Sequence, residues 1–129
     1  MDASKMEGLR TALRQRQDEI QGEVDRMDGD LRLLGIDQGE ESGSLGNHMA
    51  DDGSNMQEAE RITTIAGDLR ELLTQIGGAL ERMDEGTYGT CQRCGKPIPV
   101  ERLEAFPYVA YDIGCQSELE RENALRTGH

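Results

Sequence analysis

Two long stretches of the chain carry apolar residues at a seven-residue repeat. Each stretch has one regular lane and a second lane beside it. The lanes of the first stretch are Met6, Leu13, Ile20, Met27 and Leu34, then Leu9, Val24 and Leu31. Those of the second are Ile62, Leu69, Ile76 and Met83, then Ile65, Leu72 and Leu80. Because such a repeat gives a helix one narrow apolar stripe, the pattern predicts two long helices that each need a partner.

Local signals indicate where these helices begin and end. Ser4-Lys-Met-Glu7 has the form of a capping box and predicts the first helix start. Residues 35–54 have no apolar period and are rich in glycine, serine and acid, so they are expected to form a loop. Gly86 is a plausible stop for the second helix. Two helices of about 28 residues joined by a loop bury their stripes most simply against each other, as an antiparallel coiled-coil hairpin.

The segment after the second helix has a different composition. All three cysteines and all three prolines lie between Gly89 and Cys115. Cys91 and Cys94 form a C-x2-C knuckle, which presents two thiolates to one ion. A second knuckle is expected some 15 to 20 residues later, and Asp112-Ile-Gly-Cys115 occupies that place with aspartate as its first ligand. The spacing indicates a zinc-finger-like unit with one unusual ligand position.

Two interpretations of this segment stay open from the residues alone. Zinc accepts a carboxylate oxygen at about 2.0 to 2.2 Å, so Asp112 is able to complete a tetrahedral site with the three cysteines. Alternatively the finger binds no ion, its apolar residues hold it by packing, and Asp112 is only a local cap. A disulfide is not expected in a chain with an odd number of cysteines and no signal peptide. Neither histidine lies near a cysteine in sequence, which argues against a catalytic thiol.

The predicted fold is mainly α. Residues 1–86 are expected to form the long coiled-coil hairpin, with its tip loop at about 35–54. Residues 87–129 are expected to form a small zinc-finger-like base and a short C-terminal helix with Leu119 as its main packing residue. Within the base, Pro99 favours the start of a short helix, which Pro107 ends.

Composition and charge limit the function classes. The chain has 129 residues, with 35% hydrophobic and 3% aromatic content, which is too little for a large globular core. Its formal net charge of −12 opposes direct DNA binding, because attachment to nucleic acid relies on Lys and Arg. No apolar run is long enough for a membrane span, so we expect a cytoplasmic protein.

Two segments resemble the DksA/TraR family of bacterial RNA polymerase regulators. GTYGTCQRCGKPIPVERLEAFPYVAYDIGCQ matches the finger signature of that family, and NHMADDGSNMQEAER matches its loop-and-helix stretch. The match covers roughly residues 45–118. The resemblance implies that the helical arm enters the polymerase secondary channel without binding DNA. It also implies a polymerase-contact tip, in which Asp51 stands at the functional aspartate and Ala50, Asp52 and Gly53 are its neighbours.

The chain departs from the family at three positions. Asp112 replaces the third cysteine, which places zinc binding in question. Phe106 and Gln116 stand where well-studied relatives carry an arginine and a lysine that help to hold the alarmone ppGpp. A multiply charged anion needs such cations, so direct ppGpp synergy is not expected.

The function expected from the resemblance is a non-enzymatic regulator of transcription initiation, acting as a monomer on RNA polymerase. One alternative is a transcript-cleavage accessory factor, in which Asp51 and Asp52 help the polymerase to hold a second Mg²⁺. Another is a plain coiled-coil adaptor that associates through its apolar stripe.

Overall fold

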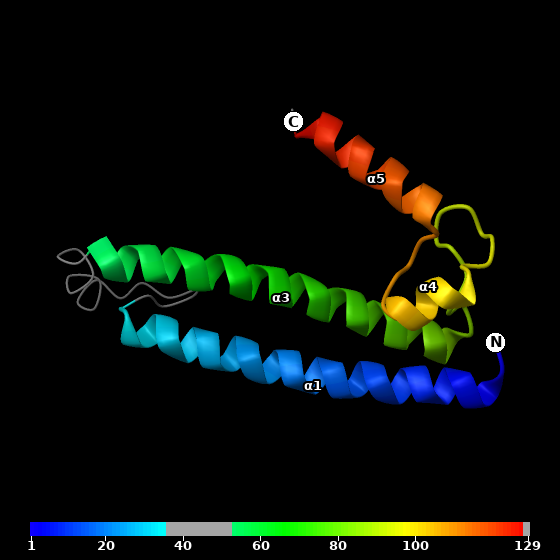
Figure 1. Ribbon diagram of the computed structural model, residues 1–129, viewed down its shortest axis with the longest axis horizontal. Coiled ribbons are helices and arrows are strands. Elements are labelled where there is room, and N and C mark those ends of the chain that lie inside the picture. Colours follow the sequence, from blue (N-terminus) through cyan, green and yellow to red (C-terminus); the bar gives the residue numbers. More distant parts are fainter. Residues whose placement is uncertain (36–52, 128–129) are drawn as a thin grey trace. The chain divides into compact units, whose positions relative to one another are not determined.

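The fold is helical. The computed structural model describes residues 1–35 and 53–127. Its helices are α1 (Ala3–Leu33), α3 (Gly53–Glu85), α4 (Val100–Ala105) and α5 (Ile113–Arg126). Helices α1 and α3 lie side by side and run in opposite directions (Figure 1). The described residues contain one isolated antiparallel bridge, between Thr90 and Pro97. They contain no β-strand. The predicted mainly α fold with a helical hairpin is confirmed.

The start of α1 differs from the prediction. The backbone N–H of Lys5 donates to the side chain of Asp2 at 2.7 Å, and the N–H of Met6 donates to the Asp2 carbonyl at 3.0 Å. Asp2 therefore caps the helix, whereas Ser4 already lies within its first turn. The predicted capping box at Ser4 is wrong, because the aspartate two residues earlier satisfies the same exposed N–H groups.

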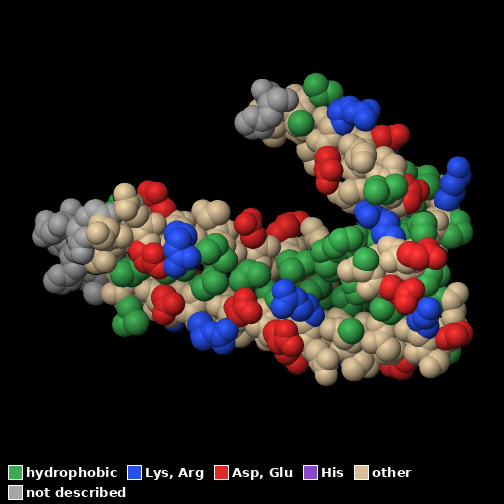
Figure 2. All heavy atoms as spheres, viewed as in Figure 1, with side chains coloured by type: hydrophobic (Ala, Val, Ile, Leu, Met, Phe, Trp, Pro, Cys, Tyr) green, Lys and Arg blue, Asp and Glu red, His purple; other side chains and the backbone are tan. Residues whose placement is uncertain are grey.

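The chain forms two compact units, of which one comprises residues 16–74. In this unit the C-terminal end of α1 packs against the N-terminal end of α3. Their contact is a cluster of Leu31, Ala59 and Ile62, with Met27 and Leu34 partly buried against it. An ion pair between Asp28 and Arg70, at 2.5 Å, joins the two helices on the polar side. Buried apolar contacts thus hold this unit together, while charged side chains of both signs are scattered over the visible faces of α1 and α3 (Figure 2).

In α3 the predicted regular lane is confirmed at three of its four positions, and the second lane is corrected. Ile62, Ile76 and Met83 of the predicted regular lane of α3 are buried. The second lane instead runs through alanines, since Ala59, Ala66 and Ala79 are also buried, whereas Ile65 and Leu72 are only partly covered. Small residues at these positions allow two helix backbones to approach closely, which large side chains would prevent.

The other unit comprises residues 1–15 and 75–129. Here Arg10 of α1 pairs with Asp84 of α3 at 2.7 Å. Helix α3 ends as predicted: Gly86 adopts a φ of 82°, and the Arg82 carbonyl accepts the N–H groups of Thr87 and Tyr88. Helix α4 also begins after Pro99 and stops before Pro107, as predicted, and buries Leu103.

The C-terminal helix α5 begins earlier than the stretch after Cys115 from which it was predicted. It begins at Ile113, so that Cys115 lies in its first turn. None of its side chains is buried, and Leu119, the expected packing residue, is only partly covered. Among the described helices, none has an apolar stretch long enough to cross a membrane.

Candidate metal centre

The first two cysteines lie on a tight backbone turn. The N–H of Gly95 donates to the carbonyl of Cys91 at 3.0 Å, and the N–H of Cys91 donates to the carbonyl of Lys96 at 2.8 Å. Gly95 has a φ of 77°, which a residue with a side chain rarely adopts. The turn brings Cys94 back beside Cys91, which is 2% exposed, so both sulfurs face the same point.

The segment before Asp112 is held although it has no regular secondary structure. The five successive backbone carbonyls of residues 107–111 each accept a hydrogen bond from elsewhere in the same unit. The donors are the Tyr88 hydroxyl, the Gln92 backbone N–H, the Arg102 side chain and the Arg82 guanidinium, which donates to two of the carbonyls. The donor–acceptor distances are 2.8 to 3.4 Å. These bonds fix the chain that delivers Asp112 to the knuckle.

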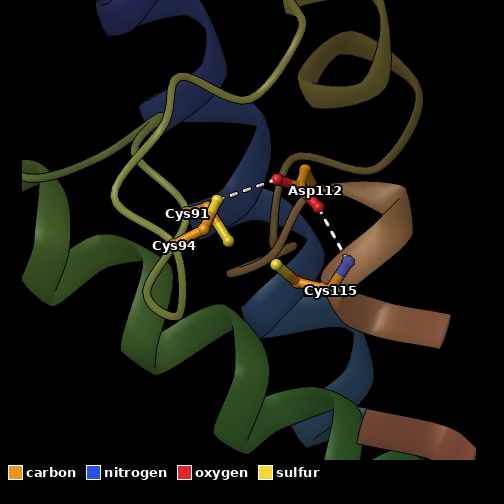
Figure 3. Close-up of side chains that lie close together, drawn as sticks. All are labelled: Cys91, Cys94, Asp112 and Cys115. Carbon is orange, nitrogen blue, oxygen red and sulfur yellow. Dashed lines mark hydrogen bonds between the residues drawn. The ribbon is translucent and has the colours of Figure 1, made fainter. Parts of the chain in front are cut away.

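The two oxygens of Asp112 have different partners. One accepts the backbone N–H of Cys115 at 2.8 Å, so Asp112 is the N-cap of α5. The other lies 3.1 Å from the sulfur of Cys94, whose thiol donates to it (Figure 3). The first bond orients the carboxylate, and the second oxygen is left pointing at the cysteines.

Four side chains converge at this place. One ligand atom from each of Cys91, Cys94, Asp112 and Cys115 lies within 4.8 Å of every other (Figure 3). Around a tetrahedral zinc ion, two sulfurs at about 2.3 Å from the metal are roughly 3.8 Å apart, so small side-chain movements would complete such a shell. Three thiolates and one carboxylate are all accepted zinc ligands. The residues therefore fit zinc in both chemistry and spacing.

The protonation of these groups follows from their surroundings. The Cys115 N–H and then the Cys94 thiol lower the pKa of Asp112 to about 2. Burial opposes ionisation of Cys91, but backbone N–H groups, that of Cys94 foremost, lower its pKa to about 7. Burial, followed by the neighbouring sulfurs, raises the pKa of Cys115 to about 12. In the metal-free protein at neutral pH the carboxylate is thus ionised, while binding a cation at Cys115 would release a proton.

The prediction from sequence missed the arginines around this centre. Arg93 lies inside the knuckle and pairs with Glu122 at 2.5 Å and with Glu118 at 3.9 Å, both on α5. Arg82 and Arg102 hold the segment before Asp112. The spacing of Glu118 and Glu122, four residues apart, was a usable signal, because such residues share one helix face. No comparable signal exists for hydrogen bonds to backbone carbonyls.

The expected polymerase-contact tip is only partly within the described residues. Ala50, Asp51 and Asp52 lie outside them, and Gly53 is the first residue of α3. These four positions stay a prediction.

Comparisons with known proteins define the class of this finger. Residues 86–121 match the family model of the prokaryotic dksA/traR C4-type zinc finger. This segment includes all four converging ligand positions. Residues 86–121 therefore form a finger of the DksA/TraR type, with aspartate at one of the four cysteine positions.

Individual relatives agree with this assignment. The chain is 42% identical over 82 residues to general stress protein 16O of Bacillus subtilis, a match that covers 64% of this chain and 50% of that protein. It is 40% identical over 56 residues to the RNA polymerase-binding transcription factor DksA of Caulobacter vibrioides, covering 43% of this chain and 39% of the other. The matched segments thus span half or less of these curated relatives.

A solved structure matches over nearly the whole chain. Transcription factor DksA2 from Pseudomonas aeruginosa aligns with a TM-score of 0.71 and 26% identity, covering 95% of this chain and 88% of that one. The similarity includes the helical hairpin as well as the finger.

Proposed function

We propose that this protein is a regulator of transcription initiation that binds RNA polymerase through the secondary channel. The observation that carries the proposal is the similarity to DksA2 across 95% of the chain, since it joins the finger to the paired helices. The name of the Caulobacter relative states that it binds RNA polymerase, and the finger is shared with it. The proposed role is that of a binding protein and not of an enzyme.

The paired helices are suited to carry a short acidic segment into a narrow passage. Helix α1 ends at Leu33 and α3 begins at Gly53, so the residues that join them contain Asp51 and Asp52. We propose that Ala50, Asp51, Asp52 and Gly53 contact the polymerase. A carboxylate near the polymerase active centre would hydrogen-bond to its mobile elements or alter the field at its metal ion.

The net charge supports a protein partner and opposes direct binding to DNA. With a formal charge of −12, the chain would be repelled by phosphates. On the visible face, acidic side chains are interspersed with single basic ones along α1 and α3, with no extended basic patch (Figure 2). We therefore propose that contacts with polymerase, and not with promoter DNA, bring the protein to its target.

The finger is proposed to hold Zn²⁺ through Cys91, Cys94, Asp112 and Cys115. When bound, the ion would supply folding free energy and no reaction chemistry, because four protein ligands leave no open position. It would join the knuckle to the first turn of α5, and so connect the two halves of the finger.

Binding to purified bacterial RNA polymerase tests the proposal. The protein should be retained on immobilised polymerase and should change initiation in a purified transcription assay without retarding promoter DNA alone. A stalled elongation complex should keep transcripts of unchanged length. Shortened transcripts would support the cleavage-factor alternative, and failure to bind polymerase would overturn the proposed function.

A further inference from the structure

Helix α5 is not held by burial of apolar side chains. None of its residues is buried, and Ile113 and Leu125 are 70% and 73% exposed. Yet this helix supplies Cys115 from its first turn, and Asp112 is its N-cap. The hydrogen bonds to residues 107–111 hold the chain only up to Asp112, so a contact along α5 itself is needed to fix the helix that carries Cys115.

Arg93 provides such a connection. It lies between Cys91 and Cys94 in the knuckle, which supplies the other two ligand positions. Its guanidinium lies 2.5 Å from the carboxylate of Glu122 and 3.9 Å from that of Glu118. The two acids are four residues apart on one face of α5, so a single arginine contacts two successive turns of the helix.

We propose that Arg93 is a positioning residue of the metal centre, which holds α5 against the knuckle so that Asp112 and Cys115 meet the ion together with the two knuckle cysteines. The apparent affinity of a site is reduced by the fraction of molecules in which its ligands are not assembled. Arg93 therefore strengthens metal binding without touching the metal. This inference rests on the proposed ligand set and is independent of polymerase binding.

The test is a metal titration of the full-length protein. Co²⁺ bound by thiolates gives an absorption band that reports assembly of the site, and competition with a chromophoric chelator gives the Zn²⁺ affinity. Arg93→Gln and the double variant Glu118→Gln/Glu122→Gln should each raise the apparent dissociation constant about threefold to tenfold at low salt, as expected for exposed ion pairs. Arg121→Gln and Glu120→Gln serve as controls, because each neutralises a charge of the same sign on α5 outside the contact with Arg93. Both variants should bind Zn²⁺ as the unmodified protein does.

Salt and charge exchange separate positioning from a general charge effect. The penalty of Arg93→Gln should shrink at about 1 M salt, where the screening length is about 3 Å. Arg93→Glu should bind more weakly still, and Arg93→Glu/Glu122→Arg should recover much of that loss. Equal affinities of Arg93→Gln and the unmodified protein at low salt, or no recovery in the exchanged variant, would overturn the inference. Absence of any thiolate–cobalt band in the unmodified protein would overturn both this inference and the proposed metal site.

Discussion

Asp112 caps the helix that carries Cys115: its carboxylate accepts the Cys115 backbone N–H at 2.8 Å. Its second oxygen lies 3.1 Å from the sulfur of Cys94, in the other half of the finger. One side chain thus performs two tasks, since it begins α5 and presents an anionic oxygen to the cysteines. The two tasks can be separated by substitution.

Asp112→Asn and Asp112→Ala should differ in what they lose. Asparagine caps a helix as well as aspartate does, so Asp112→Asn should keep the helicity of α5 but lose the anionic ligand. Its Zn²⁺ affinity should fall by more than the roughly tenfold to hundredfold caused by losing an outer-shell partner. Asp112→Ala should lose both the affinity and part of the helicity, measured by chelator competition and circular dichroism. Unchanged affinity in both variants would show that Asp112 is not a zinc ligand, and absence of Zn²⁺ binding in the unmodified protein would favour a finger held by packing alone.

Alkaline stability should depend on Tyr88. Burial raises the pKa of Tyr88 to about 12, and its hydroxyl donates to the carbonyl of Pro107 at 2.8 Å. The pKa of Tyr88 in the folded protein lies above the ordinary value of 10.0. The contribution of the protonated Tyr88 to the free energy of unfolding is therefore intact below about pH 10 and is lost as pH rises towards 12. Tyr88→Phe should remove this alkaline loss of stability. At neutral pH it should lower the free energy of unfolding by about 0.5 to 1.5 kcal/mol, because the hydrogen bond is absent.

The measurement is urea unfolding at several pH values, with the phenolate followed by absorbance. A Tyr108→Phe/Tyr111→Phe background leaves Tyr88 as the remaining tyrosine. Titration of Tyr88 near its ordinary value in the folded protein would show that its hydroxyl is not held as described.

Two leucines of α1 provide a matched test of the helix pairing. Leu31 is 0% exposed and packs with Ala59 and Ile62, whereas Leu33 is 87% exposed. Leu31→Ala should cost about 2 to 5 kcal/mol in the free energy of unfolding. Leu33→Ala should change the free energy of unfolding by less than about 0.5 kcal/mol, since leucine and alanine both favour helix and the side chain is exposed. Equal effects in chemical denaturation would show that α1 and α3 do not pair in this register.

Addition of ppGpp should change the effect of this protein on transcription little. Phe106 is 47% exposed and meets Tyr108 edge to face, and the side chain of Gln116 donates to Glu120. Neither position offers a cation to a multiply charged anion. A purified initiation assay with and without ppGpp tests this, and a large ppGpp-dependent enhancement would contradict it.

The sequence predicted the elements whose causes are local. The seven-residue repeat gave the paired helices, Gly86 marked the end of α3, and Pro99 marked the start of α4. The two knuckles also converge as their spacing predicted. For the helices the signal and the structure lie within a few residues or share one periodicity, and for the finger each knuckle is itself a local motif.

Features that depend on contacts distant in sequence were missed or wrong. The apolar pattern favoured Ile65 over its neighbour Ala66, although Ala66 is 0% exposed, because hydrophobicity does not report how closely two backbones approach. The role of Arg82 in holding the segment before Asp112 could not be predicted, since its hydrogen bonds go to backbone carbonyls 26 and 27 residues away. One local feature was also wrong: the choice of Asp2 over Ser4 as cap was open in sequence, because both residue types cap helices.

The most direct test of the central claim compares Asp51→Asn with the unmodified protein on RNA polymerase, with binding and initiation measured in the same samples. The substitution removes one negative charge from the proposed tip and leaves the length of the paired helices unchanged. We expect nearly unchanged binding together with loss of regulation. Full regulation by Asp51→Asn, or a parallel loss of binding and regulation, would contradict the proposal that an acidic tip acts inside the polymerase.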